Sequence, residues 1–289
     1  MTDLATFGDA PFFLHAHPDD ESISTGGTIA ALIEAGAHVT VVTGTRGERG
    51  EVVPGELEHL EGSDELAPHR EGELSAALDA LGGPAHVFLG SAPARIPQAA
   101  RRLYSDSGMR WGADGFAEPA TDAPATALSL APLADVVGDL LAAMLDEARH
   151  PAFSSVVSYD ARGGYGHPDH VRMHDAGLEI ARLTGRPYFA IVEPRAADAP
   201  PAADAPASAS ASASASGGEE LTVALAGAPL AAKTAAMAAH RSQLTVDPDA
   251  RTFTLSGGQT HPVAAVEHFR RMHPDRIVQF CIQEGSCTE

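Results

Sequence analysis

Short apolar runs alternate along the chain with segments of helical spacing. Residues 12–14 and 38–43 (HVTVVT) are typical of buried strands, and the segment 24–35 between them carries small and apolar residues at helical spacing up to Gly36. A strand, a helix and a second strand within about thirty residues form a βαβ unit. Such a unit implies parallel strands joined by a right-handed crossover.

The alternation continues through most of the chain. It predicts further helices over 70–81, 132–149, 168–183 and 228–244 and further strands over 86–89, 154–159, 188–192 and 221–225. The stretch 90–132 is rich in Pro, Gly and Ala and too long for a simple connection, so we expect it to contribute to a substrate pocket. We therefore expect an α/β fold in one domain spanning 1–289, with a Rossmann-like, mostly parallel sheet and helices on both faces.

One segment departs from this pattern. Residues 196–218 consist almost entirely of Ala, Ser, Pro and Asp, and Ala and Ser alternate over 207–216. Such a composition buries too little apolar surface to offset the entropy of ordering. We expect a disordered, low-complexity insertion within the domain.

The charge of the chain narrows the choice of ligand. Its 39 acidic and 19 basic residues give a net charge of −20, which repels nucleic acids and anionic membranes and disfavours polyphosphates. A neutral or cationic small molecule fits better. No apolar run approaches the length of a bilayer span, no basic-then-apolar leader precedes residue 12, and the only cysteines are Cys281 and Cys287. We expect a cytoplasmic protein, and the sequence does not indicate its oligomeric state.

Two His- and Asp-rich motifs carry the candidate chemistry. HAHPDDE at 15–21 follows the first predicted strand, and GGYGHPDH at 163–170 follows the strand over 154–159. Because the carboxyl ends of parallel strands meet at one edge of a sheet, the two motifs can converge there. One His-x-x-Asp is weak evidence for a metal site, but two such clusters after two strands predict a metal-dependent hydrolase.

Each residue of these motifs suits a role. His17 and Asp20, three apart around a Pro-led turn, and His170 form a two-His, one-carboxylate set with an open position, which suits Zn²⁺ and also Fe²⁺. Asp19 is the candidate general base for the attacking water. His167 is the candidate acid for the leaving nitrogen. Asp169 is a candidate for orienting a histidine, and Tyr165 offers a hydroxyl to the oxyanion.

Other polar residues receive simpler interpretations. We expect Glu21 to cap the following helix or to bond to the backbone, and His15 to be structural. The loop GTRGERG at 44–50 follows a strand but lacks the GxGxxG order of a nucleotide site. We expect surface positions for His261, His268 and His273.

The motifs resemble those of the PIG-L/LmbE-type N-acetylglucosamine deacetylase family. HPDDE at 17–21 pairs with GHPDH at 166–170, and TGGTIA at 25–30 and TRGERGE at 45–51 are also similar. The resemblance implies a Rossmann-like fold and zinc-dependent removal of an N-acetyl group from a glucosamine unit. It also implies the roles given above for the residues of the two motifs.

The resemblance is greater to the mycothiol branch of this family. The stretches that carry it are DSGM at 106–109, GGYGHPDH at 163–170 and KTAAMAAHRSQ at 233–243. It implies that Arg70, Asp106 and Met109 bind substrate, with the first two contacting sugar and inositol hydroxyls. STGGT at 24–28 departs from an Asn-Gly-Ala version that is usual in that branch.

The leading prediction is a zinc-dependent deacetylase of an amino-sugar small molecule, N-acetylglucosaminyl-inositol above all. The alternatives are a mycothiol S-conjugate amidase, a deacetylase of another amino sugar and, in a different class, a non-catalytic sugar- or metal-binding module. An intact Asp19 disfavours the last, because a binding protein needs ligands but no base.

Overall fold

A seven-stranded sheet forms the centre of the molecule. The structure, a computed structural model, describes residues 4–113, 115–146, 152–192 and 218–272. The strand order is β3-β2-β1-β6-β7-β12-β8. The first five of these strands are parallel, and β12 is antiparallel to both of its neighbours. The strands span β1 (Pro11–His15), β2 (Thr40–Thr43), β3 (Ala85–Phe88), β6 (Ser155–Tyr159), β7 (Tyr188–Ile191), β8 (Glu219–Ala224) and β12 (Val266–Met272).

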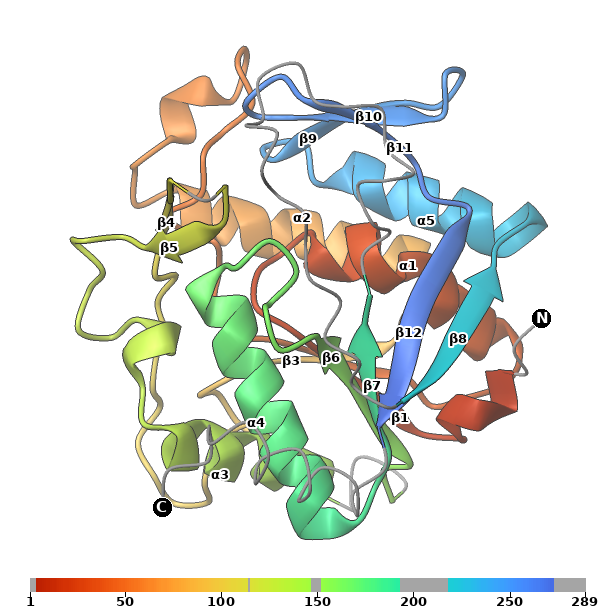
Figure 1. Cartoon of the computed structure of the whole chain (residues 1–289). Helices are drawn as coiled ribbons and strands as arrows, with labels where there is room; N and C mark the ends of the chain where they lie inside the picture. Colours follow the sequence, from red (N-terminus) through yellow and green to blue (C-terminus); the bar gives the residue numbers. More distant parts are fainter. Residues whose placement is uncertain (1–3, 114, 147–151, 193–217, 273–289) are drawn as a thin grey trace.

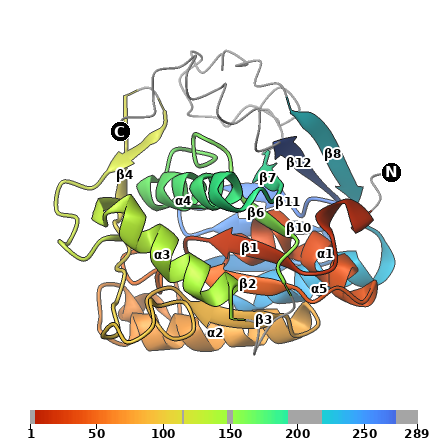
Figure 2. The same ribbon diagram turned by 90° about the horizontal axis from the view of Figure 1, so that it is seen from below.

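Helices cover both faces of this sheet, as predicted. α1 (Asp20–Glu34), α2 (Leu66–Ala80) and α5 (Gly227–Ala239) pack on one face, and α3 (Leu133–Met144) and α4 (Pro168–Thr184) on the other (Figures 1 and 2). The described residues also form short 3₁₀ helices at Leu4–Phe7, Glu58–Leu60 and Leu128–Leu130. The result is the Rossmann-like α/β architecture that the alternating pattern predicted.

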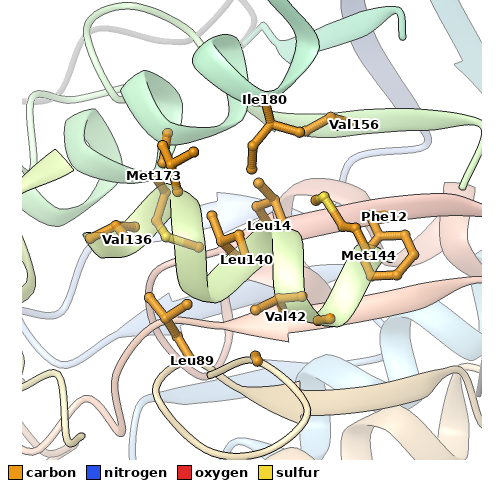
Figure 3. Packing of buried hydrophobic residues seen from close by; sticks show 14 of the residues in the cluster. Phe12, Leu14, Val42, Leu89, Val136, Leu140, Met144, Val156, Met173 and Ile180 are labelled. Atoms are coloured by element: carbon orange, nitrogen blue, oxygen red, sulfur yellow. The ribbon is translucent and has the colours of Figure 1, made fainter. Parts of the chain in front are cut away.

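The core lies in two layers because β1 is apolar on both sides. Phe12 and Leu14 point toward α3 and α4, where they pack with Leu140 and Met173 (Figure 3). Phe13 points the opposite way, into the cluster formed with α1, α2 and α5. Side chains of a strand alternate between faces, so a continuous apolar run is what a strand buried on both sides requires.

Several boundaries differ from the prediction. α1 begins at Asp20 rather than at residue 24, so the first motif runs directly into the helix. α3 ends at Met144 rather than 149, because the N–H of Asp146 bonds to the carbonyl of Ala143 and tightens the last turn. α5 ends at Ala239 rather than 244, because the backbone of His240 leaves the helical conformation.

Besides β12, the structure contains five strands that the sequence pattern did not predict. β9 (Leu244–Asp247), β10 (Thr252–Leu255) and β11 (Thr260–Pro262) form an antiparallel sheet. β4 (Met109–Trp111) and β5 (Ala117–Pro119) form a hairpin within the irregular stretch 90–132. His261 is exposed, as expected, whereas His268, on β12, is half-buried. His273 lies outside the described residues.

Two further predictions concern the whole chain. The Ala/Ser-rich segment 196–218 lies, apart from Gly218, outside the described residues. Within the described part of the chain, none of the helices has the length and apolarity needed to cross a membrane. The cytoplasmic location expected from the sequence stays a prediction.

Candidate active site

The two motifs meet at the carboxyl edge of the sheet. β1 and β6 are parallel neighbours. The chain leaves β1 into His17, and it leaves β6 into a loop that ends at His167, after which the first turn of α4 carries His170. His170 Nε2 lies 3.2 Å from His17 Nδ1, although 153 positions separate the two residues. The predicted convergence of the motifs is therefore confirmed.

A strained turn presents the first motif. Asp19 has a φ of 104°, a left-handed conformation that costs a residue with a Cβ about 1–3 kcal/mol. The turn is held by Asp20 Oδ2, which accepts hydrogen bonds from the backbone N–H of His17 at 2.9 Å and from the Tyr159 hydroxyl at 2.7 Å. The Tyr159 oxygen in turn accepts from the N–H of Ala16 at 2.8 Å. Strand β6 thus fixes the turn that follows β1.

Three buried donor atoms lie close together at the centre of the site. Asp20 Oδ2 is 3.4 Å from both His17 Nδ1 and His170 Nε2. Burial alone would raise the pKa of Asp20, but the two imidazoles outweigh it and hold that pKa well below its ordinary value. Two imidazole nitrogens and a carboxylate oxygen are a donor set that suits a divalent transition metal.

The cluster holds more donors than these three. His167 joins His17 and His170 in a second possible ligand set, and His17 forms a third with Asp106, His167 and Asp169. The pKa of His17 rises well above its ordinary value, because the surrounding carboxylates outweigh the effect of burial. We favour the set with Asp20, since its three atoms already lie within 3.4 Å of one another.

The Asp169 carboxylate contacts the Nε2 atom of the His17 ring. Its Oδ2 lies 3.2 Å from His17 Nε2 and accepts the N–H of Ser107 at 2.9 Å, while its Oδ1 accepts the N–H of Ser129 at 2.8 Å. The Ser107 hydroxyl also donates to this carboxylate. Asp169 therefore joins the first motif to the DSGM segment, which fits the orienting role expected of it.

The pKa values of Asp19 and His167 are shifted in opposite directions. Burial, and next the charge of Asp20, raise the pKa of Asp19 to about 8. Burial, and next the charges of His17 and His170, lower the pKa of His167 to about 3. Nδ1 of His167 accepts the backbone N–H of Asp169 at 3.2 Å, which assigns the proton of the neutral ring to Nε2.

Asp106, Tyr165 and Met109, which were also predicted as site residues, lie next to the cluster or follow it in the chain. Asp106 is buried, with Oδ1 3.6 Å from His17 Nε2. The Tyr165 ring lies 5.2 Å from the His170 ring, and Met109 begins the β4–β5 hairpin that follows Asp106. Burial raises the pKa of Asp106, but His17 outweighs it and the pKa is lowered.

Arg70 is buried beneath a loop. Its guanidinium donates to the carbonyls of Gly47 and Glu51, the latter at 2.8 Å, and to Ser242 Oγ at 3.3 Å. Its contacts in the structure are thus with the protein itself, and they order the TRGERGE loop beside Asp19.

Sequence reasoning missed the buried residues that support the first motif. His240 Nε2 lies 2.8 Å from Glu21 Oε1, and Glu21 Oε2 accepts the N–H of Asp19 at 3.0 Å. Gln243 donates to the carbonyl of Pro18 at 2.8 Å. The segment KTAAMAAHRSQ was visible as a family-like stretch, but nothing in one sequence placed it under the HPDDE turn. The backbone bond of Glu21 was predicted.

Comparison with known proteins agrees with this geometry. The profile of the PIG-L family, described as GlcNAc-PI de-N-acetylase, matches residues 12–181, more than half of the chain. The chain belongs to the PIG-L family. The match includes both motifs and nearly all of β1 and β6, the two strands that lead into them.

Individual PIG-L relatives are similar over most of their length. A protein of Saccharomonospora viridis, named 1D-myo-inositol 2-acetamido-2-deoxy-alpha-D-glucopyranoside deacetylase, is 41% identical over 89% of this chain and 92% of its own. One of the same name from Kineococcus radiotolerans is 38% identical, covering 90% of this chain and 76% of its own. Among solved structures, a deacetylase–teicoplanin complex shares the fold with a TM-score of 0.56 at 20% identity, over 91% of this chain and 98% of that one.

Proposed function

We propose that this chain is a metal-dependent N-deacetylase that hydrolyses the acetamide of N-acetylglucosaminyl-inositol to acetate and a free amine. The observation that carries the proposal is that His17, Asp20 and His170 meet at the carboxyl edge of the sheet, with Asp19 directly before Asp20 in the sequence. The names of the relatives from Saccharomonospora viridis and Kineococcus radiotolerans support the choice of substrate.

The residues fit a bound divalent metal. His17 Nδ1 and His170 Nε2 face each other at 3.2 Å with Asp20 Oδ2 beside them, and these buried groups are a donor set that Zn²⁺ or Fe²⁺ accepts. We propose Zn²⁺, held by His17, Asp20 and His170. When bound, such an ion polarises the amide carbonyl and lowers the pKa of water.

Asp19 is the proposed general base. It sits on the strained turn, half-buried, and takes the proton of the attacking water. Its carboxyl must be ionised to do so. Burial raises the pKa of this carboxyl to about 8, and a cation held by the proposed ligands would lower it. Asp19 can then return this proton to the leaving nitrogen.

His167 contributes to the same step. The sequence suggested that it is the acid for the leaving nitrogen, but a pKa of about 3 favours the neutral ring at physiological pH. A neutral ring with its proton on Nε2 can donate a hydrogen bond to the reacting amide without releasing the proton. We therefore propose Asp19 as the source of the proton and His167 as the hydrogen-bond donor, with the Tyr165 hydroxyl as a second donor to the oxyanion.

We propose that the DSGM segment, which borders the cluster, binds hydroxyl groups of the substrate. Asp106 is close enough to His17 to contact a sugar bound there, and Met109 continues from it into the hairpin. Arg70 acts through the loop at Gly47 and Glu51 that it orders.

Release of free amine by zinc-loaded protein tests the function. N-acetylglucosaminyl-inositol and a mycothiol S-conjugate should be assayed side by side, with Asp19→Asn as the control. We expect turnover of the first and its loss in the control. Preference for the conjugate would indicate the amidase instead. Stoichiometric metal without turnover of either compound would leave another amino sugar, or a binding module, and would overturn the proposed substrate.

A further inference from the structure

The β4–β5 hairpin exposes the only tryptophan of the chain. The side chain of Trp111, at the end of β4, is 62% exposed. Single exposed apolar residues are normal on protein surfaces. This indole differs from such residues because it lies next to Tyr165 of the candidate active site.

The hairpin is attached to the second motif. The N–H of Ala117 on β5 donates to the carbonyl of Tyr165 at 2.9 Å. The guanidinium of Arg162 lies over the Phe116 ring, 5.2 Å from its centre. At its other end the hairpin continues directly from the DSGM segment, whose Ser107 is bonded to Asp169. Figure 1 shows the hairpin beside the start of α4. The position of Trp111 is therefore set by the active-site loops.

A series of rings leads outward from the proposed metal ligands. The Tyr165 ring lies 5.2 Å from the His170 ring, and the Trp111 ring lies 6.0 Å from the Tyr165 ring, at an interplanar angle of 44°. A substrate whose acetamide lies at His170 must extend the rest of its structure away from the buried cluster. Tyr165 and Trp111 offer aromatic faces along that direction, ending in the half-exposed hairpin.

We propose that Trp111 determines specificity by stacking its indole against the second ring of the substrate, the cyclic polyol that carries no acetamide. This inference rests on the proposed deacetylase function. The carbon-bound hydrogens of a polyol ring form an apolar face, and a large aromatic side chain gains contact area with such a face at little entropic cost. Asp106 holds hydroxyl groups nearer the metal ligands, so the two residues act on different parts of one ligand.

Because the chain has one tryptophan, fluorescence excited at the red edge of the absorption band, where tyrosine does not absorb, reports on this residue alone. Zinc-loaded Asp19→Asn protein, which binds without turnover, is titrated with N-acetylglucosaminyl-inositol and with N-acetylglucosamine. We expect a saturable change in emission with the two-ring compound and none with the single sugar. No change with the two-ring compound would overturn the proposal.

Kinetics provide the second readout. Trp111→Ala should raise KM for N-acetylglucosaminyl-inositol about tenfold, keep kcat, and leave kcat/KM for N-acetylglucosamine unchanged, whereas Trp111→Phe should retain most of the affinity. Leu183→Ala is the control, because Leu183 is also an exposed apolar residue, 53% exposed, and lies at the far end of α4. An unchanged KM, or equal losses on both substrates, would overturn the proposal. If the wild-type protein deacetylates neither compound, the proposed function fails, and the fluorescence titration alone decides whether Trp111 binds the polyol.

Discussion

His240 Nε2 lies 2.8 Å from Glu21 Oε1, and both side chains are fully buried. The other oxygen of Glu21 accepts the N–H of Asp19, whose backbone is strained. An ion pair between the end of α5 and the start of α1 thus holds the conformation of the proposed general base. Its loss should affect both the stability of the protein and the placement of Asp19.

Glu21→Gln should lower the free energy of unfolding by about 3 kcal/mol at pH 6, because it leaves the partner charge of His240 buried and uncompensated. Urea unfolding measures this value. Glu179→Gln is the matched control: the Glu179–Arg182 pair, at 2.6 Å, is partly exposed, and its loss should cost less than about 1 kcal/mol. Equal effects of the two substitutions would contradict the role of the buried pair.

The same pair predicts a pH dependence of stability. Burial opposes the shift in each partner, but the opposite charge outweighs it, so the pKa of Glu21 is lowered and that of His240 is raised. The Glu21 contribution is present above its ordinary pKa, near 4.5, and is lost as the pH falls through the lowered value. The His240 contribution is present below about 6.5 and is lost as the pH rises through the raised value. The wild-type advantage over Glu21→Gln should therefore be greatest between about pH 4.5 and 6.5 and decline on both sides.

Metal content should distinguish the alternative ligand sets. His170→Ala removes one of the three atoms that lie within 3.4 Å of one another, so zinc affinity should fall by more than the roughly hundredfold typical of a lost supporting residue. His167→Ala should retain zinc. A chromophoric chelator in competition measures both affinities. Loss of zinc in both variants would indicate the set of His17, His167 and His170, and the reverse order would indicate the set of His17, Asp106, His167 and Asp169, in which His170 is not a ligand.

The sequence predicted that the two motifs converge, but it did not predict the distant residues that hydrogen-bond to them. Both β1 and β6 contain short apolar runs, typical of strands buried on both faces, so their parallel pairing and the convergence of the motifs after them could be predicted from the sequence pattern. Pro168 directly after His167 marked the start of α4, because proline suits the first turn of a helix. The contacts of Tyr159 with Asp20 and of Asp169 with Ser107 join residues far apart in sequence, and no local pattern encodes such pairs.

β12 shows why other elements were missed. Its inward positions are Glu267 and Phe269, and a buried carboxylate conceals the alternation that identifies a strand. Glu267 is tolerated there because Lys233 donates to it at 2.6 Å and because the N–H groups of Gly27 and Thr28 donate to it at 3.0 and 2.8 Å. Only the tertiary structure supplies these partners.

The pH profile of His167→Gln should decide which residue protonates the leaving amine. If His167 donates a hydrogen bond only, the glutamine amide replaces part of that interaction, kcat falls by about a hundredfold, and the shape of the kcat/KM profile is unchanged. If an imidazolium supplies the proton, the basic limb of the profile disappears with the substitution. The pKa of about 3 favours the first result. Loss of the basic limb would return the acid role to His167.

Two glycine substitutions should have opposite effects on stability. A Cβ at Gly27, within α1, would overlap the side chain of Leu225 in the core, so Gly27→Ala should destabilise the protein by about 1–3 kcal/mol. Gly72 lies on the exposed side of α2 with open space around it, and Gly72→Ala should stabilise the protein by about 0.5–1 kcal/mol through helix propensity and a less flexible unfolded chain. Urea unfolding of both variants checks the signs. A neutral Gly27→Ala would mean that α1 and Leu225 are further apart than the structure places them, and the contact of Glu267 with the same turn of α1 would then be in doubt as well.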